Sequence, residues 1–298
     1  MPVNFFRSGV FFVVAILLTL LSACGGNSSI TAVKTQSNTS TPALGATYNA
    51  DVYVYAADGM TLLAQGKTSG STGRSNLTLT GYTPGTPVIV KVVLDPANGV
   101  TYYDENRPDS VSVPPSSKFT MLSIFPFATP GQDLTANALT NMAAKFAGIS
   151  ADNLGKTKLS TPLVADKVYE GVAKTNLVLG LPTSTNILAS VTPATQASPT
   201  PNGTLSNLLV SLATASFGDT QDPIQRAANL ANAINSDGTI DTDKSSIFTG
   251  VNSALVDLGL NVVEPKITNH DINSSLSAAI AAARTSFASF TGSVTGGN

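Results

Sequence analysis

The sequence predicts an α+β protein in which an N-terminal antiparallel β-sandwich is followed by a C-terminal all-α helical bundle. Two observations predict this class. Between residues 49 and 127, apolar residues tend to recur at every second position in short runs that turn signals separate. From Thr135 onward the apolar period changes to 3.6, which is typical of amphipathic helices. We therefore expect a β-sandwich domain over 49–130 and a helical domain over 131–298.

The chain begins with a segment typical of export signals. An apolar run over 10–21 follows a short head in which Arg7 is the only charged side chain. The run is too short to span a bilayer as a permanent helix. It ends in Leu21-Ser22-Ala23-Cys24, which contains the only cysteine of the chain.

This ending resembles the lipobox of bacterial lipoproteins, a Leu-(Ser/Ala)-(Ala/Gly)-Cys run that is cleaved before the cysteine. The resemblance implies that 1–23 is a signal peptide, that the Cys24 thiol takes up a diacylglycerol, and that a further acyl chain such as palmitate is added at its amino group. Several buried acyl chains make such an anchor effectively permanent. An ordinary secretory signal cleaved at a nearby alanine is the alternative.

The position after Cys24 bears on localisation. By the sorting rule of the lipoprotein family, an aspartate there favours the inner membrane, and this chain has Gly25. The resemblance therefore points to a lipid-anchored protein of the outer membrane, facing the periplasm or the surface; a Gram-positive host would hold it in its single membrane. Residues 24–48 are polar and small, and we expect them to form a flexible tether.

Seven short runs are the expected strands of the sandwich. Asp58-Gly59 offers a tight hairpin turn after the first, and 95–99 is a strong turn signal after the central apolar run. The runs lie at 52–55, 62–63, 77–80, 88–94, 102–103, 111–113 and 119–125.

The pattern over 52–59, 63–68 and 77–79 resembles carboxypeptidase-regulatory-like and prealbumin-type sandwich modules of surface proteins. The resemblance covers about 80 residues and implies a spacer or binding module without catalysis. Some carbohydrate-binding domains share this sandwich, in which exposed tyrosines would stack on sugar rings. The alternative is that the tyrosines cover a half-exposed sheet face. The residues concerned are Tyr53, Tyr55, Tyr82, Tyr102 and Tyr103.

Five or six amphipathic helices are expected in the second half. Gly148 and Gly259 supply helix stops, and Asp222-Pro223 reads as an N-cap followed by proline at the first helical position. The apolar stripes lie at 139–146, 164–172, 205–212, 224–234, 247–258 and 276–290. Alanine at many contact positions favours close helix packing.

Composition and motifs exclude several kinds of function. Only 11% of residues are charged, and 16 basic against 18 acidic residues with no basic cluster argue against nucleic acid. Gly66-Lys67-Thr68 and Gly155-Lys156-Thr157 lack the earlier glycine of a phosphate loop, so no nucleotide is expected. His270 is the only histidine and is expected in a surface loop, which excludes metal sites that need two imidazoles from one chain. We expect no cofactor, no metal and no catalytic residue.

A calcium-binding loop over 235–243 is the weak alternative to the expectation that the protein binds no metal. In EF-hand register, Gly238 takes the sharp-turn position, but Ala233 and Lys244 stand where calcium needs carboxylates. We interpret the segment as a turn in which Asp241 or Asp243 caps the following helix.

Three functional hypotheses remain. The leading one is a non-catalytic envelope lipoprotein that binds another protein or a glycan through its sandwich or its bundle. The second is a structural spacer without a ligand. The third is a hydrolase that uses paired carboxylates, and the sequence does not select any of its candidates, Asp104, Glu105, Glu170 and Glu264, for that role.

Overall fold

The structure is a computed structural model that describes residues 34–106, 112–214 and 222–294, with side chains described as far as residue 289. The expected signal peptide 1–23, Cys24 and Gly25 lie outside the described residues. Residues from Lys34 onward form one compact unit. Within the described residues, no helix is both long enough and apolar enough to cross a membrane.

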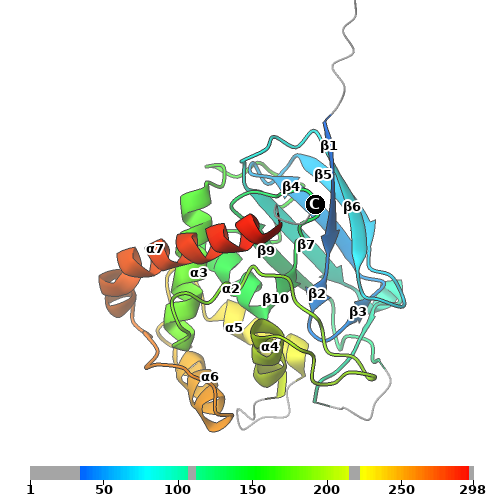
Figure 1. Cartoon of the computed structure of the whole chain (residues 1–298). Helices are drawn as coiled ribbons and strands as arrows, with labels where there is room; N and C mark the ends of the chain where they lie inside the picture. Colours follow the sequence, from blue (N-terminus) through cyan, green and yellow to red (C-terminus); the bar gives the residue numbers. More distant parts are fainter. Residues whose placement is uncertain (1–33, 107–111, 215–221, 295–298) are drawn as a thin grey trace, which may run out of the picture. The chain divides into compact units, whose positions relative to one another are not determined.

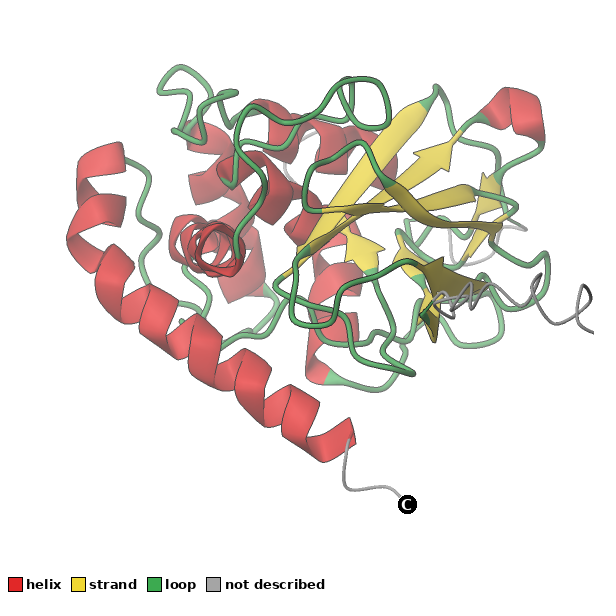
Figure 2. Ribbon diagram, turned by 90° about the horizontal axis from the view of Figure 1, so that it is seen from above, coloured by secondary structure: helices red, strands yellow, loops and turns green. Residues whose placement is uncertain are grey.

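The expected mixed α and β class is confirmed (Figures 1 and 2), with strands in the N-terminal half and six described helices in the C-terminal half. The strands are β1 (Thr35–Ser40), β2 (Pro42–Ala43), β3 (Thr47–Tyr48), β4 (Asp51–Ala56), β5 (Leu62–Lys67), β6 (Ser75–Thr80), β7 (Val88–Leu94), β8 (Thr101–Tyr102), β9 (Phe119–Phe125) and β10 (Ala136–Asn137). The helices are α2 (Ala138–Phe146), α3 (Ala165–Leu179), α4 (Thr204–Thr214), α5 (Pro223–Asn232), α6 (Ser246–Asp257) and α7 (Asn269–Val294), with a 3₁₀ turn, η1 (Pro96–Asn98), between β7 and β8.

The main sheet has four antiparallel strands in the order β5-β4-β7-β9. Its central strand β7 is the expected central apolar run, which only Lys91 interrupts, and five of its seven residues are buried. In β4, Val52 and Val54 are fully buried, as their alternation predicts. Three two-stranded pairs complete the strand set, β1-β6 and β3-β8 antiparallel and β10-β2 parallel.

The C-terminal part of the expected tether is not a tether. Residues 35–48 contain β1, β2 and β3, and β1 pairs with β6 along its whole length, from Thr35 opposite Thr80 to Ser40 opposite Ser75. Polar side chains hold this segment: the Asn38 amide donates to the Thr129 and Gln132 carbonyl oxygens at 2.8 and 3.0 Å. Small polar side chains predict a linker, but here they supply the hydrogen bonds that a buried strand needs.

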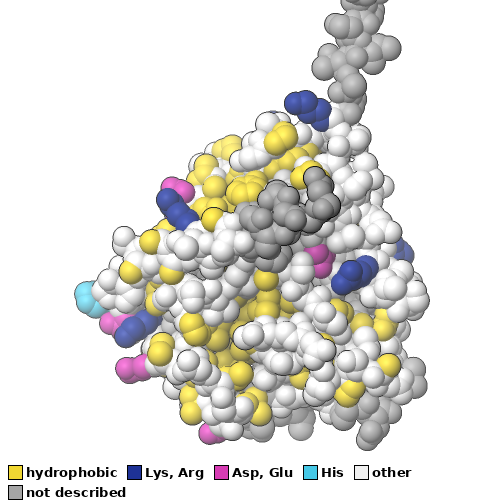
Figure 3. Space-filling model, viewed as in Figure 1, with side chains coloured by type: hydrophobic (Ala, Val, Ile, Leu, Met, Phe, Trp, Pro, Cys, Tyr) yellow, Lys and Arg dark blue, Asp and Glu magenta, His cyan; other side chains and the backbone are white. Residues whose placement is uncertain are grey.

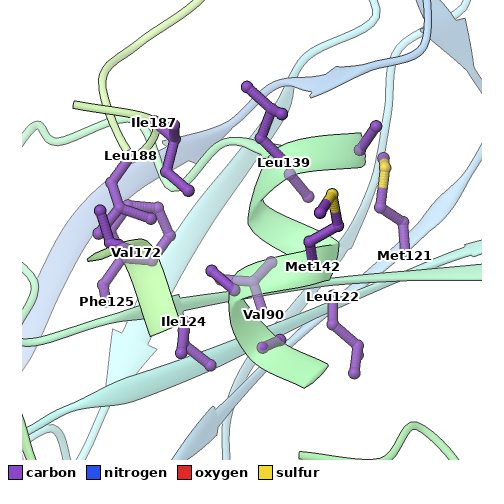
Figure 4. Close-up of a cluster of buried hydrophobic side chains, with 14 of the residues drawn as sticks. Val90, Met121, Leu122, Ile124, Phe125, Leu139, Met142, Val172, Ile187 and Leu188 are labelled. Atoms are coloured by element: carbon purple, nitrogen blue, oxygen red, sulfur yellow. The ribbon is translucent and has the colours of Figure 1, made fainter. Parts of the chain in front are cut away.

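Strands and helices share one hydrophobic core, which differs from the expected division near residue 130. Figure 4 shows side chains of β7, β9, α2 and α3 packed together with Ile187 and Leu188. Helix α2 is also bonded directly to β9, because the Asn141 amide oxygen accepts from the Leu122 N–H at 3.0 Å and the Thr140 hydroxyl donates to the Leu122 carbonyl at 3.0 Å. The two halves of the chain therefore support each other.

Candidate functional site

The expected sugar-stacking tyrosines do not form an exposed platform. Four of the five, Tyr55, Tyr82, Tyr102 and Tyr103, are at most 7% exposed, so for them both sugar stacking and the alternative, a place on a half-exposed sheet face, are wrong. Tyr82 lies inside a hydrogen-bonded corner, where its hydroxyl donates to the Thr86 carbonyl at 2.9 Å and accepts from the Ala128 N–H at 2.8 Å. Tyr53 is half-buried, and its ring stacks on that of Tyr55.

The four candidate carboxylates lie on separate elements, except for the neighbours Asp104 and Glu105. Both neighbours are buried, and burial raises the pKa of Glu105 to about 8. The cavity beside Glu105 measures about 20 Å³, enough for one water molecule and too small for a sugar ring. Glu170 forms ion pairs with lysines of its own helix, and Glu264 is exposed before α7.

The expected calcium segment is an internally bonded turn. Asp237 accepts from the Thr239 N–H and hydroxyl at 3.0 and 2.6 Å, and Asp241 pairs with Lys244 at 2.7 Å. The expected helix cap is wrong, because α6 begins after Ser245 and Asp241 accepts instead from the Asp243 N–H at 3.1 Å. Among the described residues no group of three or more potential metal-binding side chains occurs.

The remaining sequence candidates take structural roles. His270 is exposed in the first turn of α7. Gly66 and Lys67 belong to β5, and the Gly155 N–H donates to the Gly59 carbonyl at 2.9 Å, so neither Gly-Lys-Thr segment opens a helix as a phosphate loop would.

The strongest candidate site is an uncharged pocket that sequence reasoning missed, with a volume of about 490 Å³. Three segments far apart in the chain line it: 181–192 after α3, 202–208 at the start of α4, and 260–262 between α6 and α7. None of the described residues that line it is charged or aromatic. Two other hollows of similar volume, about 520 and 580 Å³, are lined by only five and six residues and offer a ligand fewer contacts.

Two buried asparagines fix the walls of this pocket. The Asn176 amide, in α3, donates to the Thr185 carbonyl at 2.9 Å. The Asn252 amide, in α6, donates to the carbonyl oxygens of Leu179 and Val263, both at 2.9 Å. Because each amide bonds to backbone outside its own helix, the loops that form the pocket are held to the helical core.

The start of α4 forms the opposite wall. The Ser206 hydroxyl accepts from the Thr192 N–H at 3.0 Å, which ties α4 to the segment after α3. Ile187 and Leu188 anchor that segment in the core (Figure 4), while neighbouring Asn186 and Ala189 line the pocket. The pocket therefore combines leucine, alanine, proline and valine contacts with hydroxyl and amide groups.

Exposed apolar residues stand on both sides of the lining segment 260–262 in the chain. Val256 and Leu258, at the end of α6, and Val263, next to the lining residue Val262, are 51–63% exposed. Figure 3 shows, on the face it presents, that charged side chains are sparse, some of them beside a side chain of opposite sign, and that apolar ones gather in patches. A pocket without charged lining residues suits an uncharged ligand, because a charged group would lose hydration without gaining a partner.

The comparisons with known proteins found no similar protein. No protein-family model matches the chain, and neither the curated proteins nor the solved structures gave a match.

Proposed function

We propose that the protein is a lipid-anchored, non-catalytic binding module of the bacterial outer membrane, which captures an uncharged apolar segment of another envelope protein. The lipid anchor is supported by Leu21-Ser22-Ala23-Cys24, and the outer membrane by Gly25. The single observation that carries the binding function is the pocket of about 490 Å³ with no charged residue among its described lining.

The chemistry of the pocket favours a peptide over a glycan. Sugar sites commonly stack the ring on an aromatic side chain, and no aromatic residue is among the described lining residues. Leucine and valine contacts fit an apolar side chain, and the Thr185, Asn186 and Thr204 side chains offer hydrogen bonds to a peptide backbone.

We also propose that the strands form a β-sandwich and that the helices form a bundle joined to it. The sandwich is supported by β6, which follows β5 through a short loop and buries Leu77 and Leu79 on one face. The bundle is supported by the packing of α3 against α2 and α7, and by the buried alanines Ala143 and Ala173.

The anchor is tested by changing Cys24 and Gly25. We expect Cys24→Ala to abolish labelling with radioactive palmitate and to remove the protein from membrane fractions, because no thiol remains to carry diacylglycerol. Gly25→Asp should keep the label but move the protein to the inner-membrane fraction. Gly25→Ser is the matched control and should stay in the outer membrane. Palmitate labelling that persists in Cys24→Ala would contradict the anchor.

The pocket is tested by photocrosslinking in living cells. With a photoreactive phenylalanine at Thr204 on the pocket wall, we expect crosslinks to an envelope protein after irradiation. Adding Ala189→Trp should reduce these crosslinks about tenfold or more, because the indole occupies the cavity. Ala97→Trp, at an exposed position in η1, is the matched control and should leave them unchanged. Crosslinks that are insensitive to Ala189→Trp would exclude the pocket as the binding site.

A further inference from the structure

We propose that the end of the fold at which the chain enters β1 rests against the lipid bilayer, with Met60, Leu62 and Val164 in contact with the headgroup region. The inference rests on the proposed anchor at Cys24. The inference specifies which face of the folded unit lies against the membrane. It therefore also specifies the direction in which the pocket opens.

The exposed apolar residues fall into two groups. Among the residues whose side chains are described, the large apolar ones that are most exposed are Met60, Leu62, Val164, Val256, Leu258 and Val263, at 45–63%. The last three stand in the chain on either side of the pocket segment 260–262. The first three surround the hairpin between β4 and β5 and have no part in that site. An exposed apolar group on a polar protein marks an interaction surface.

Val164 is placed beside this hairpin by backbone hydrogen bonds. The Leu159 N–H donates to the Asp58 carbonyl at 2.9 Å, and the Leu163 N–H donates to the Ala57 carbonyl at 2.8 Å. The segment before α3 therefore runs along the hairpin turn. Met60, Leu62 and Val164 are therefore exposed residues of two segments that lie side by side.

The chain enters the fold at the same end. Strand β5 leads through residues 68–74 into β6, which packs beside it in the opposite direction, so Leu62 at the start of β5 and Thr80 at the end of β6 share one end. Thr80 lies opposite Thr35, the first residue of β1, and the Gly81 N–H donates to the Lys34 carbonyl at 3.0 Å. Figure 1 shows the chain entering β1 at the top of the view, close to the labels of β4 and β5.

The length of chain before β1 brings this end near the membrane. Cys24 and Lys34 are ten residues apart. A chain of this length spans at most roughly 35 Å when fully extended, and a coil of the same length averages roughly 17 Å. The first group of apolar residues therefore lies at the end of the fold into which the segment after Cys24 leads.

The charges at this end suit anionic headgroups. Lys34, Lys156 and Lys158 are exposed there. Asp58 lies 3.8 Å from Lys158, Asp152 is also exposed, and Asp166, two residues from Val164, pairs with Arg284 at 2.7 Å, so basic side chains outnumber acids by one in this group. Exposed lysines beside apolar side chains are typical of surfaces that rest on anionic membranes.

The pocket lies toward the opposite end. Ala46, beyond the last residue of β1, donates its N–H to the Ala194 carbonyl at 2.7 Å. Ala194 is two residues from Thr192, which lines the pocket. With the β4-β5 hairpin on the bilayer, the pocket is turned away from the lipid and toward a partner.

Site-specific fluorescence tests this orientation, because acylated Cys24 leaves the chain without a free thiol. Full-length acylated protein with Met60→Cys, Leu62→Cys or Val164→Cys is labelled with an environment-sensitive fluorophore and reconstituted into equimolar phosphatidylcholine and phosphatidylglycerol vesicles. A nitroxide on the upper acyl chain of the lipid should quench these three labels by about twofold or more, as expected for shallow insertion. Labels at the equally exposed control positions Val256→Cys and Val263→Cys should not be quenched.

The outcomes separate this inference from the proposed anchor. Acylated protein that floats with the vesicles but shows no quenching at 60, 62 and 164, or equal quenching at 256 and 263, would overturn the orientation and leave the anchor in place. An unmodified Cys24 by mass spectrometry would overturn both. In the Val164→Cys protein, adding Met60→Asp and Leu62→Asp should reduce quenching while flotation persists, since the lipid anchor is unchanged.

Discussion

Replacing Gly180 by alanine is expected to lower the free energy of unfolding by about 2–4 kcal/mol, because the change adds strain at a left-handed residue to a clash with backbone. Gly180 ends α3 with φ of 66°. A Cβ atom there would overlap the Val263 carbonyl oxygen and lie 2.5 Å from the Asn252 amide nitrogen. The same carbonyl and amide hold the segment that closes the pocket, so ligand capture should weaken together with stability.

Gly259→Ala is the matched control. Gly259 follows α6 with φ of 74°, and nothing lies within 4 Å of the Cβ that alanine would add. Only the backbone strain remains, and we expect a loss of about 1 kcal/mol. Urea denaturation of both variants measures the difference. Equal losses would show that Val263 does not approach Gly180 as closely as the structure places it.

The helices could be predicted because their signals are local. Asp222-Pro223 caps α5 as expected, since the Asp222 carboxylate accepts from the Gln225 N–H at 2.7 Å. The six apolar stripes likewise correspond to α2 through α7. A stripe of period 3.6 needs no knowledge of its partner to be recognised.

Features that depend on distant contacts could not be predicted. Strand β1 consists of serine, threonine, asparagine and glutamine, and only its pairing with β6 and its bonds to residues 129–134 make it a strand. Tyr55 is covered by the loop at Gly155, which alternation within β4 does not reveal. The pocket joins three segments of ordinary residues, so no motif marks it.

The second large effect is expected for Glu105→Gln. Glu105 is 8% exposed, and its Oε2 atom has no hydrogen-bond partner in the structure. Burial raises its pKa from 4.5 to about 8, with neighbouring Asp104 adding to the shift. Between these values the folded protein holds a proton that the unfolded chain has released. The free energy of unfolding therefore falls as the pH rises from 4.5 to about 8, and the fall stops above that.

Glutamine is neutral at every pH and should remove this dependence. Glu105→Gln is expected to stay within about 1 kcal/mol of the wild type near pH 5 and to exceed its stability by about 3–4 kcal/mol near pH 7 to 8, since one pKa unit corresponds to about 1.4 kcal/mol. Acids with lowered pKa values, such as Asp58 and Glu170, raise the free energy of unfolding while they are ionised. This contribution is lost as the pH falls through their lowered pKa values. Their effect therefore does not mask the slope above pH 5.

Urea denaturation between pH 5 and 8 measures this slope. The exposed Glu264→Gln variant removes a carboxylate from the surface and should follow the wild type at each pH. A Glu105→Gln protein that keeps the wild-type slope would show that another buried acid controls it. Asp133 is the next to examine, because burial also raises its pKa. If the free energy of unfolding is independent of pH in Glu105→Gln and in no other variant, one buried carboxyl group is the reason that the fold is less stable at neutral pH.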